Sequence, residues 1–532
     1  MKRMFITALL GVVGIPLTGQ TDFSFRNAFR YGDGQRFNGF GTTAFRYFEN
    51  LTDMQITHDG HYRFGLRYTQ DSPAETGLRK EEFSRWFAEY DTDSWTIRAG
   101  HSPALFGQGL SLNLFEDRGQ GFDSWLQGLT GVYRHAFFRI QAIAGKVEID
   151  DSLVFRRQDR YDLTGGSLIV LPSGPVEIGI SAVHARGFGT VPTVPFSLSS
   201  DLSSFSIKTN FDTWSFLSDY LVRWTKDDIT GLTKTGSAFY SSVSWFSDLI
   251  SLTVDYKNYR LDVTNPIDRL DPYRPFKLLP FQNPPTVQKE HSWFFISRSL
   301  NEQDFNDQTG VQAEIFINPA EKLQLTANGS FSSRTTSWQQ DVFDFTWSRT
   351  TGSLLLFPSS KEMYSPFHEL FLEADYEFSD DFSLRGAVAT RSFHLYNDFT
   401  GPAGSHQQSD RVLMGWLQWK VTDSQTTQVQ SEWIQSDDNF SPDPHSSGIF
   451  LSWIQTIDGF WNVALRHERT TNTFDPGGRK DWTLFETGLR LDGRHLITVS
   501  GGQERGGLTC TNGVCRFIQP FTGVRVSIIS TL

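Results

Sequence analysis

Long apolar runs are missing from this sequence. After the first twenty residues, no stretch of 18 or more apolar residues occurs. A helix needs about 20 such residues to cross a bilayer, so the sequence excludes a protein built of membrane helices. Segments dominated by basic residues are also missing, and the net charge is −12. Because nucleic-acid binding depends on clustered positive charge, we expect no nucleic-acid partner.

Cysteine is nearly absent, with only Cys510 and Cys515, which flank the turn pair Asn512-Gly513. In an exported protein, the natural interpretation of this spacing is a small disulfide-closed loop. A metal or redox pair is the alternative, although no third or fourth ligand lies nearby in the sequence. No cysteine lies near residue 20, which argues against a lipid-anchored lipoprotein.

Local motifs for catalysis, cofactors and metals are missing as well. The 12 histidines are scattered and predict no metal site. No G-x-S-x-G nucleophile motif occurs, and the glycine-rich residues 106–128 lack the lysine and Ser/Thr of a phosphate-binding loop. We therefore predict no catalytic residue, no cofactor and no metal. No energy-coupling motif is evident before Phe23, which argues against a TonB-driven receptor.

The amino terminus shows the pattern of a cleavable secretory signal. Lys2 and Arg3 precede the apolar residues 5–13, and small and polar residues follow up to Gln20. This order is typical of exported proteins. We predict a signal peptide over residues 1–20 and one domain over residues 21–532, because no linker, low-complexity stretch or charge run divides the remainder.

Aromatic residues are abundant, at 14% of the chain, with 47 Phe, 15 Trp and 15 Tyr. A transmembrane barrel needs aromatic girdles at both membrane interfaces, whereas a soluble domain seldom combines so many aromatic residues with so many Gly, Ser and Thr. The mean hydropathy of −0.35 is compatible with a barrel, because half of the strand residues of a barrel face a polar lumen. The composition therefore favours a membrane barrel.

Apolar and polar side chains alternate along most of the chain. In residues 370–378, Leu370, Leu372 and Tyr376 share one face, and Glu373 and Glu377 share the other. A period of two predicts a strand with one apolar and one polar face. About two dozen such stretches follow one another, with no clear helical period.

Short and long connections alternate between these stretches, as in outer-membrane barrels with tight periplasmic turns and long outer loops. The short turns are Asp59-Gly60 and residues 91–93, 172–174, 211–213, 247–248, 319–321, 379–381, 423–425, 458–459 and 492–494. Together the patterns predict an all-β fold, a transmembrane antiparallel up-and-down β-barrel of about 24 strands (range about 20–26). An even number places both termini in the periplasm.

Three long connections could fold into the lumen of so wide a barrel, because barrels near this size are generally plugged. They cover residues 100–123, 264–308 and 336–368. For the first two segments, an inward fold and a position on the outer rim are equally weighted interpretations.

Residues 106–128 form the candidate lumen motif, which contains Phe106, Gly107, Gly109, Glu116, Asp117, Arg118 and Asp123. The glycines permit tight turns, and the charged residues could form an ion-pair network or a polar contact surface. Two interpretations remain open, a constriction or ligand site and a structural staple that pins an inward loop to the wall. The staple is the favoured one.

This motif also resembles an uncharacterised family of large outer-membrane barrels, known only as a domain of unknown function. The matching features include Phe106, Gly107, Gly109, Leu110, the run Glu116-Asp117-Arg118, Gly121, Asp123, Leu126 and Gly128. Residues 62–68 and the end of the chain from Cys510 are similar as well. The resemblance implies an outer-membrane barrel and supplies no activity. The chain departs from many such barrels in ending on Leu532 instead of an aromatic residue.

The leading functional hypothesis is an integral outer-membrane conduit for an unknown solute. The alternative is a non-transporting scaffold whose lumen is filled by its own loops and which docks a surface or periplasmic protein. An enzyme with a serine or histidine at the rim ranks third. The expected partners are outer-membrane lipid, the barrel-insertion machinery and, for the scaffold, another protein.

Overall fold

The computed structural model describes residues 20–37, 41–75, 79–118, 122–151, 157–172, 174–191, 194–271, 274–298, 304–350, 354–472, 478–511, 514–518 and 520–532. The predicted signal peptide therefore lies outside the described residues, apart from Gln20. No helix in the described ranges is long and apolar enough to cross a membrane.

The alternating stretches form one antiparallel sheet of 24 strands. They are β1 (Thr21–Phe37), β2 (Thr42–His58), β3 (Tyr62–Asp71), β4 (Lys80–Asp91), β5 (Trp95–Ser102), β10 (Leu126–His135), β11 (Phe138–Asp151), β12 (Arg157–Val170), β13 (Val176–Val191), β14 (Val194–Asn210), β15 (Trp214–Asp227), β16 (Thr233–Phe246), β17 (Ile250–Arg260), β18 (Gln308–Ala320), β19 (Leu323–Ser333), β22 (Phe367–Ser379), β23 (Phe382–Leu395), β24 (His406–Thr422), β25 (Gln425–Asp438), β26 (His445–Ile457), β27 (Trp461–Thr470), β28 (Asp481–Leu491), β29 (His495–Glu504) and β32 (Phe521–Thr531).

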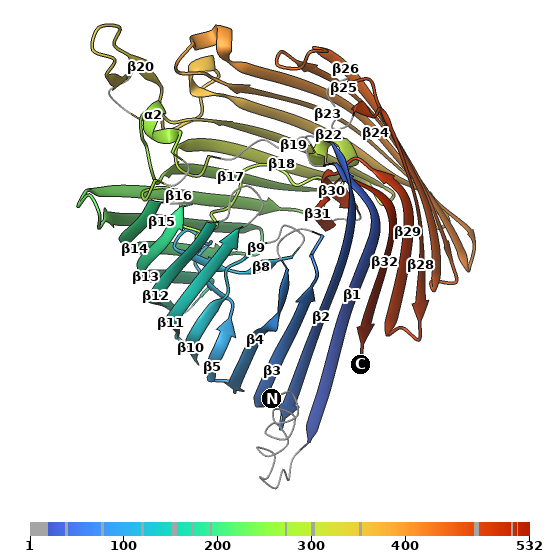
Figure 1. The fold of residues 1–532 in the computed structure, drawn as a ribbon, viewed down its shortest axis with the longest axis horizontal. Helices are drawn as coiled ribbons and strands as arrows, with labels where there is room; N and C mark the ends of the chain where they lie inside the picture. Colours follow the sequence, from blue (N-terminus) through green and yellow to red (C-terminus); the bar gives the residue numbers. More distant parts are fainter. Residues whose placement is uncertain are drawn as a thin grey trace.

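The sheet closes on itself, because β1 pairs with β32 as well as with β2. In the closing ladder, Arg26 lies opposite Thr531 and Arg36 lies opposite Phe521. The other barrel strands pair with their neighbours in the chain, and the wall follows the sequence colours from blue to red (Figure 1). The predicted all-β, antiparallel up-and-down barrel of about 24 strands is confirmed.

Tight turns close one end of the barrel, and three of them contain an Asp-Gly pair. Asp59 and Gly60 have φ of 53° and 70°, and the pairs at 458–459 and 492–493 have similar values. Such pairs suit two-residue hairpin turns that require positive φ at both positions. The first and last described residues lie here, because the Gln20 carbonyl accepts a hydrogen bond from the Asp59 amide and the Thr531 amide donates one to the Arg494 carbonyl.

The remaining short elements belong to the longer connections at the opposite end, which we call the loop end. They are β6 (Ala104–Phe106), β7 (Leu112–Leu114), β8 (Glu116–Asp117), β9 (Phe122–Asp123), α2 (Pro266–Arg269), α3 (Phe294–Arg298), β20 (Trp338–Gln340), β21 (Trp347–Arg349), η1 (Glu362–Tyr364), η2 (Gly401–Gly404), β30 (Gly507–Thr511) and β31 (Val514–Ile518).

The two faces of the wall have opposite character, as β22 illustrates. Leu370 and Leu372 point outward and are 49% and 44% exposed, whereas Glu369 and Phe371 point into the lumen and are buried. Large apolar side chains are exposed in the same way on strands all round the barrel, including Leu129, Phe205, Leu413 and Val524. An apolar outer face around a polar lumen is the architecture of a transmembrane barrel.

Candidate functional site within the lumen

Two connections at the loop end turn back into the barrel and form the candidate site. The inner loop comprises residues 103–125, described over 103–118 and 122–125, and joins β5 to β10. The strap comprises residues 262–298, described over 262–271 and 274–298, and follows β17. Both pack on the lumenal face of the wall, so the first two long segments fold inward.

The third long segment stays outside the lumen. We call residues 334–366, described over 334–350 and 354–366, the outer loop. Its Leu355 and Leu356 carbonyls accept hydrogen bonds from Asn258 and from Tyr256 on β17. These two donors flank Lys257, which is fully buried on the lumenal face, so alternation places them on the outer face. The outer loop therefore covers the outside of the wall.

Apolar side chains hold the inner loop against β11–β17. Phe106, Leu110, Leu112 and Leu114 are at most 1% exposed. They share one buried cluster with wall residues Ile143, Val147, Tyr161, Leu163, Val183, Leu202, Leu221 and Tyr259 and with strap residues Leu279 and Phe281. Each such side chain contributes roughly 1.5–3 kcal/mol when it is fully buried. The cluster therefore anchors the inner loop and the near end of the strap together.

Two glycines of the predicted motif let the inner loop approach its neighbours closely. Gly107 and Gly109 have φ of +57° and +84°. A Cβ on Gly107 would lie 2.3 Å from Asp219 Oδ2, and one on Gly109 would lie 2.6 Å from the Asn283 carbonyl. The Gln108 amide donates to Asp219 Oδ2 at 2.8 Å. Glycine is required here both by the backbone conformation and by the space.

Arg223 fastens the near end of the strap to the wall. This β15 side chain is 1% exposed and donates through Nη1 to the Lys277 carbonyl at 2.9 Å and to Gln282 Oε1 at 3.0 Å. Its Nη2 donates to the Leu261 carbonyl at 3.0 Å and to the Phe276 carbonyl. One buried guanidinium thus satisfies four acceptors, three of them backbone carbonyls outside any strand or helix.

The charged part of the motif meets two wall arginines. Glu116 accepts hydrogen bonds from Arg67 Nη1 at 2.7 Å and from Arg85 Nη1 at 2.6 Å. Arg85 also forms an ion pair with Asp123 at 2.6 Å and lies over the Trp125 ring at 4.0 Å. These contacts hold the part of the inner loop around Glu116 and Asp123 against β3 and β4.

The remaining charged residues of the motif lie in and directly after β8. Asp117 lies opposite Phe122 in the β8–β9 ladder, and Arg118 is exposed at the end of β8. The structure therefore brings Glu116 and Asp123 together on Arg85, while Phe106, Gly107 and Gly109 serve the apolar end of the same loop. We propose that the motif is a staple, the favoured interpretation of the sequence.

The Glu116→Ala variant is expected to loosen the inner loop. Hydrogen bonds to a charged group contribute about 1.5–3 kcal/mol, so amide exchange in residues 110–118 should rise roughly 10- to 100-fold, at about 1.4 kcal/mol per tenfold. Hydrogen–deuterium exchange with mass spectrometry measures this, and Glu148→Ala, which removes an exposed ion pair with Lys146, is the matched control. Equal exchange in the two variants would contradict the staple.

The far end of the strap docks on the wall formed by β22–β26. Phe294, Phe295 and Ile296 of α3 are buried, and the Phe294 ring stacks on Phe450 at a centroid distance of 3.7 Å. The rest of this second cluster comprises Trp293 and wall residues Phe371, Ala387, Ala389, Val412 and Met414. The strap therefore follows the lumenal wall from β17 to β26, since Lys289 pairs with Glu314 on β18 and Trp293 donates to Glu373 on β22 on the way.

Carboxylates on the wall receive the polar groups of α3. Glu432 accepts hydrogen bonds from the Phe294 amide at 2.6 Å and the Phe295 amide at 2.9 Å. Arg298 donates to Glu468 at 2.7 Å. Burial lowers the pKa of Arg298, and the Glu468 carboxylate counteracts part of this effect. Glu432 thereby satisfies two amides at the start of the short helix, and Glu468 pairs with the arginine side chain at its last residue.

A third carboxylate, Glu369, holds the chain just before α3. It accepts a hydrogen bond from His291 Nε2 at 2.8 Å and forms an ion pair with Arg391, which also donates to the Ile296 carbonyl at 2.8 Å. No local sequence motif marks any of these docking residues. The alternation predicted for residues 370–378, extended by one position, would have indicated that Glu369 faces the lumen.

The base of the strap lies where β17 and β18 leave the wall. The Asp262 amide donates to the Asn306 carbonyl at 3.2 Å, so the two ends of the connection lie side by side. Asp307 accepts hydrogen bonds from the Thr335 and Thr336 hydroxyls. Burial raises the pKa of Asp307 despite these hydrogen bonds. The strap is therefore a long connection whose two ends lie close together and are held by hydrogen bonds.

The wall on the far side of the lumen carries charges. Around β1, Arg30 pairs with Glu49 at 3.0 Å and with Glu75, and Arg525 pairs with Glu75 at 2.9 Å. The Arg30 side chain is 36% exposed, so part of this cluster faces solvent. Glu75 comes from the β3–β4 connection, which also bends toward the wall.

The two cysteines lie in the small hairpin formed by β30 and β31. Cys510 is directly opposite Cys515 in this ladder, and the side chains of residues 508–519 lie outside the described part. The disulfide stays a prediction. We expect the oxidised protein to take up no alkylating reagent until it is reduced and then to gain two adducts by mass spectrometry. Labelling of both thiols without reductant would contradict the disulfide.

Within the described ranges, no group of three or more His, Cys, Asp and Glu side chains is placed to hold a metal ion.

Fold and site together define a transmembrane β-barrel whose lumen contains two segments of its own chain, packed on the wall. The "Family of unknown function (DUF6029)" matches residues 48–532, and the chain belongs to this family. This confirms the resemblance to an uncharacterised family. A comparison with functionally curated protein sequences gives no match.

Several solved structures are similar to this chain. The siderophore receptor PirA from Pseudomonas aeruginosa shares 7% identity at a TM-score of 0.48, over 96% of this chain and 80% of its own. The copper transporter OprC shares 10% identity at a TM-score of 0.43, over 97% and 81%. The P pilus usher translocation pore PapC shares 9% identity at a TM-score of 0.41, over 96% and 99%.

Proposed function

We propose that this protein is an outer-membrane conduit whose passage is gated by the strap. The main support for this proposal is that the two sides of the lumen differ. The strap packs on β11–β17 and on β22–β26, whereas the wall around β1 presents charged side chains such as Arg30 that are partly exposed. A barrel of this size is wide enough for an aqueous passage unless it is plugged, and the charged wall supplies a hydrated surface.

The contacts of the strap suit a segment that can be released. Many of them are hydrogen bonds to charged wall groups, and because water hydrates both partners on undocking, the net cost of losing each bond is limited to about 1.5–3 kcal/mol. The apolar contacts of α3 involve a five-residue helix, so undocking it exposes a limited surface. The near end, held by Arg223 and the first cluster, is the firmer attachment.

The proposed orientation follows from the positions of turns and termini. Outer-membrane barrels have short periplasmic turns and long external loops. We therefore place both termini and the Asp-Gly turns in the periplasm and the base of the strap at the outer end. Insertion by the barrel-insertion machinery belongs to the same proposal.

The second candidate function is a scaffold that docks another protein. One observation favours it, which is the apolar tip of the outer loop, where Val342, Phe343 and Phe345 are 77%, 90% and 67% exposed. A patch of this kind on a soluble surface often marks an interaction site. A scaffold predicts a stoichiometric partner that co-purifies and is lost when the tip is made polar.

Liposome swelling tests the conduit. Purified protein, whose fold is checked by heat-modifiable gel mobility, is reconstituted into liposomes. Swelling of the liposomes is then recorded in solutions of sugars of increasing size. We expect slow entry of the smallest sugars and exclusion of larger ones. A folded protein that admits no solute of any size would refute the conduit and favour the scaffold.

A further inference from the structure

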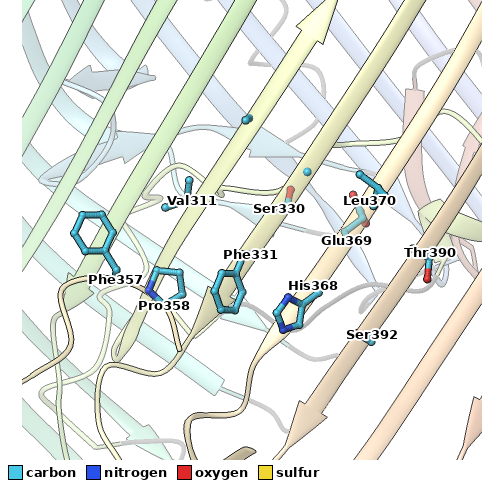
Figure 2. Close-up of a pocket in the computed structure, with 12 residues that line it drawn as sticks. Val311, Ser330, Phe331, Phe357, Pro358, His368, Glu369, Leu370, Thr390 and Ser392 are labelled. Atoms are coloured by element: carbon cyan, nitrogen blue, oxygen red, sulfur yellow. The ribbon is translucent and has the colours of Figure 1, made fainter. Parts of the chain in front are cut away.

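A hollow on the outer face of the wall lies beneath the outer loop. It measures about 600 Å³, within the size range of small-molecule sites, ~300–1,000 Å³. Its lining includes Val311, Ala313, Gly329, Phe331, Leu370 and Phe357. Figure 2 shows Phe357 and Pro358 beside Phe331 and His368. The hollow is thus an apolar depression in the outer face of the wall.

Small residues and aromatic rings shape this depression. Ala313 lies opposite Gly329, and Gly329 lies opposite Leu370 in the ladders of β18, β19 and β22. A Cβ on Gly329 would meet no atom within 4 Å, so the glycine leaves open space beside the wall. The Phe331 and His368 rings stack at 4.4 Å and close one side of the space.

A second, polar hollow of about 420 Å³ adjoins the first and shares His368 and Ser392 with it. Its lining includes the carboxylates Glu362, Asp437 and Asp438 and the side chain of His394. His394 is 93% buried, since 7% of it is exposed, and within the described residues its Nε2 has no hydrogen-bond partner. This imidazole nitrogen is therefore available to hydrogen-bond a polar group bound in the hollow.

We infer that these two hollows form one binding site for a membrane lipid. One acyl chain lies in the apolar hollow beneath Phe357, and the headgroup lies in the polar hollow within reach of His394. Because the carboxylates of Glu362 and Asp437 line the polar hollow, the site favours a zwitterionic lipid with an ammonium group over an anionic lipid. The proposal rests on the membrane placement of the barrel in the proposed function, because that placement puts the hollow against lipid.

Two glycine variants test the apolar hollow. Gly329→Leu fills the space without a backbone clash, whereas Gly131→Leu adds the same side chain to the outer face of β10, where a Cβ also meets no atom within 4 Å. Delipidated protein is titrated with phosphatidylethanolamine and analysed by native mass spectrometry. We expect one tightly bound lipid, at least about tenfold weaker binding in Gly329→Leu because several methylene contacts are lost, and unchanged binding in Gly131→Leu.

Two comparisons test the headgroup. We expect the wild-type protein to bind phosphatidylglycerol less tightly than phosphatidylethanolamine. We also expect the His394→Phe variant to bind phosphatidylethanolamine less tightly than the wild-type protein does. Equal binding by wild type and Gly329→Leu, or an equal loss in Gly131→Leu, would overturn the site. Equal binding of the two lipids would overturn the headgroup assignment. Solute entry by these variants separates the two proposals, because a folded barrel that conducts without binding lipid refutes only the site.

Discussion

A barrel without its strap is expected to conduct ions steadily and at a high level, whereas the intact protein is expected to remain closed most of the time. Residues 264–304 can be replaced by a short Gly-Ser linker, because the Asp262 amide lies 3.2 Å from the Asn306 carbonyl. The physical reason is the width of the lumen, which for about 24 strands exceeds what wall side chains can fill. We expect at least a tenfold rise in mean conductance in planar bilayers.

The matched control removes a segment of the outer loop. Its tip, residues 338–349, can be excised because the Thr350 amide lies 3.0 Å from the Ser337 carbonyl. This excision should leave the conductance unchanged, since the tip lies outside the lumen. Heat-modifiable gel mobility confirms that both variants are folded. A folded strap-less barrel with wild-type conductance would show that other segments occlude the lumen.

The second large effect is expected from Arg223→Met, which should release the near end of the strap. Methionine keeps most of the side-chain length but donates no hydrogen bond, so three carbonyls and Gln282 lose their shared donor. Leaving a buried acceptor unsatisfied costs about 1–3 kcal/mol, and a total near 3 kcal/mol corresponds to roughly a 100-fold shift in the equilibrium. We expect a comparable rise in open probability.

The control for Arg223→Met is Arg26→Met, because Arg26 is exposed on β1. Hydrogen–deuterium exchange should show faster exchange in residues 274–284 of the Arg223 variant and no change in the control. Faster exchange without more openings would separate strap release from conduction and would count against the gate.

The architecture could be predicted from the sequence because its determinants are local. Alternation in residues 370–378 fixed which side chains share a face, and the Asp-Gly turn at 59–60 marked a hairpin. The structure places Leu370 and Leu372 outside and Glu373 inside, where the Trp293 indole donates to it at 2.7 Å. The β10–β11 turn at 136–137 carries no Asp or Gly, and it was not identified as a turn.

The docking of the strap could not be predicted, because it joins residues far apart in the sequence. His291 and Glu369 are separated by 78 positions, and Arg298 and Glu468 by 170. Alternation reveals that a glutamate faces the lumen and says nothing about what it meets there. The outer loop posed the same difficulty, since an apolar stretch such as residues 354–358 suits either face of the wall.

The glycine motif was the most informative part of the sequence for the site. Gly107 and Gly109 indicated tight turns, and both have positive φ against neighbouring chain. The partners of Glu116 could not be identified, because Arg67 and Arg85 are two among many arginines of lumen-facing strands. The sequence therefore indicated where the chain makes a special contact and left the contacted surface open.

Single-channel recording of the wild-type protein beside the strap-less variant tests the gated conduit most directly. The account predicts brief, rare openings of the wild type to the current level that the strap-less barrel holds continuously. A wild-type protein that never opens at any voltage, next to a steadily conducting strap-less variant, would contradict the gate and identify a permanently plugged scaffold.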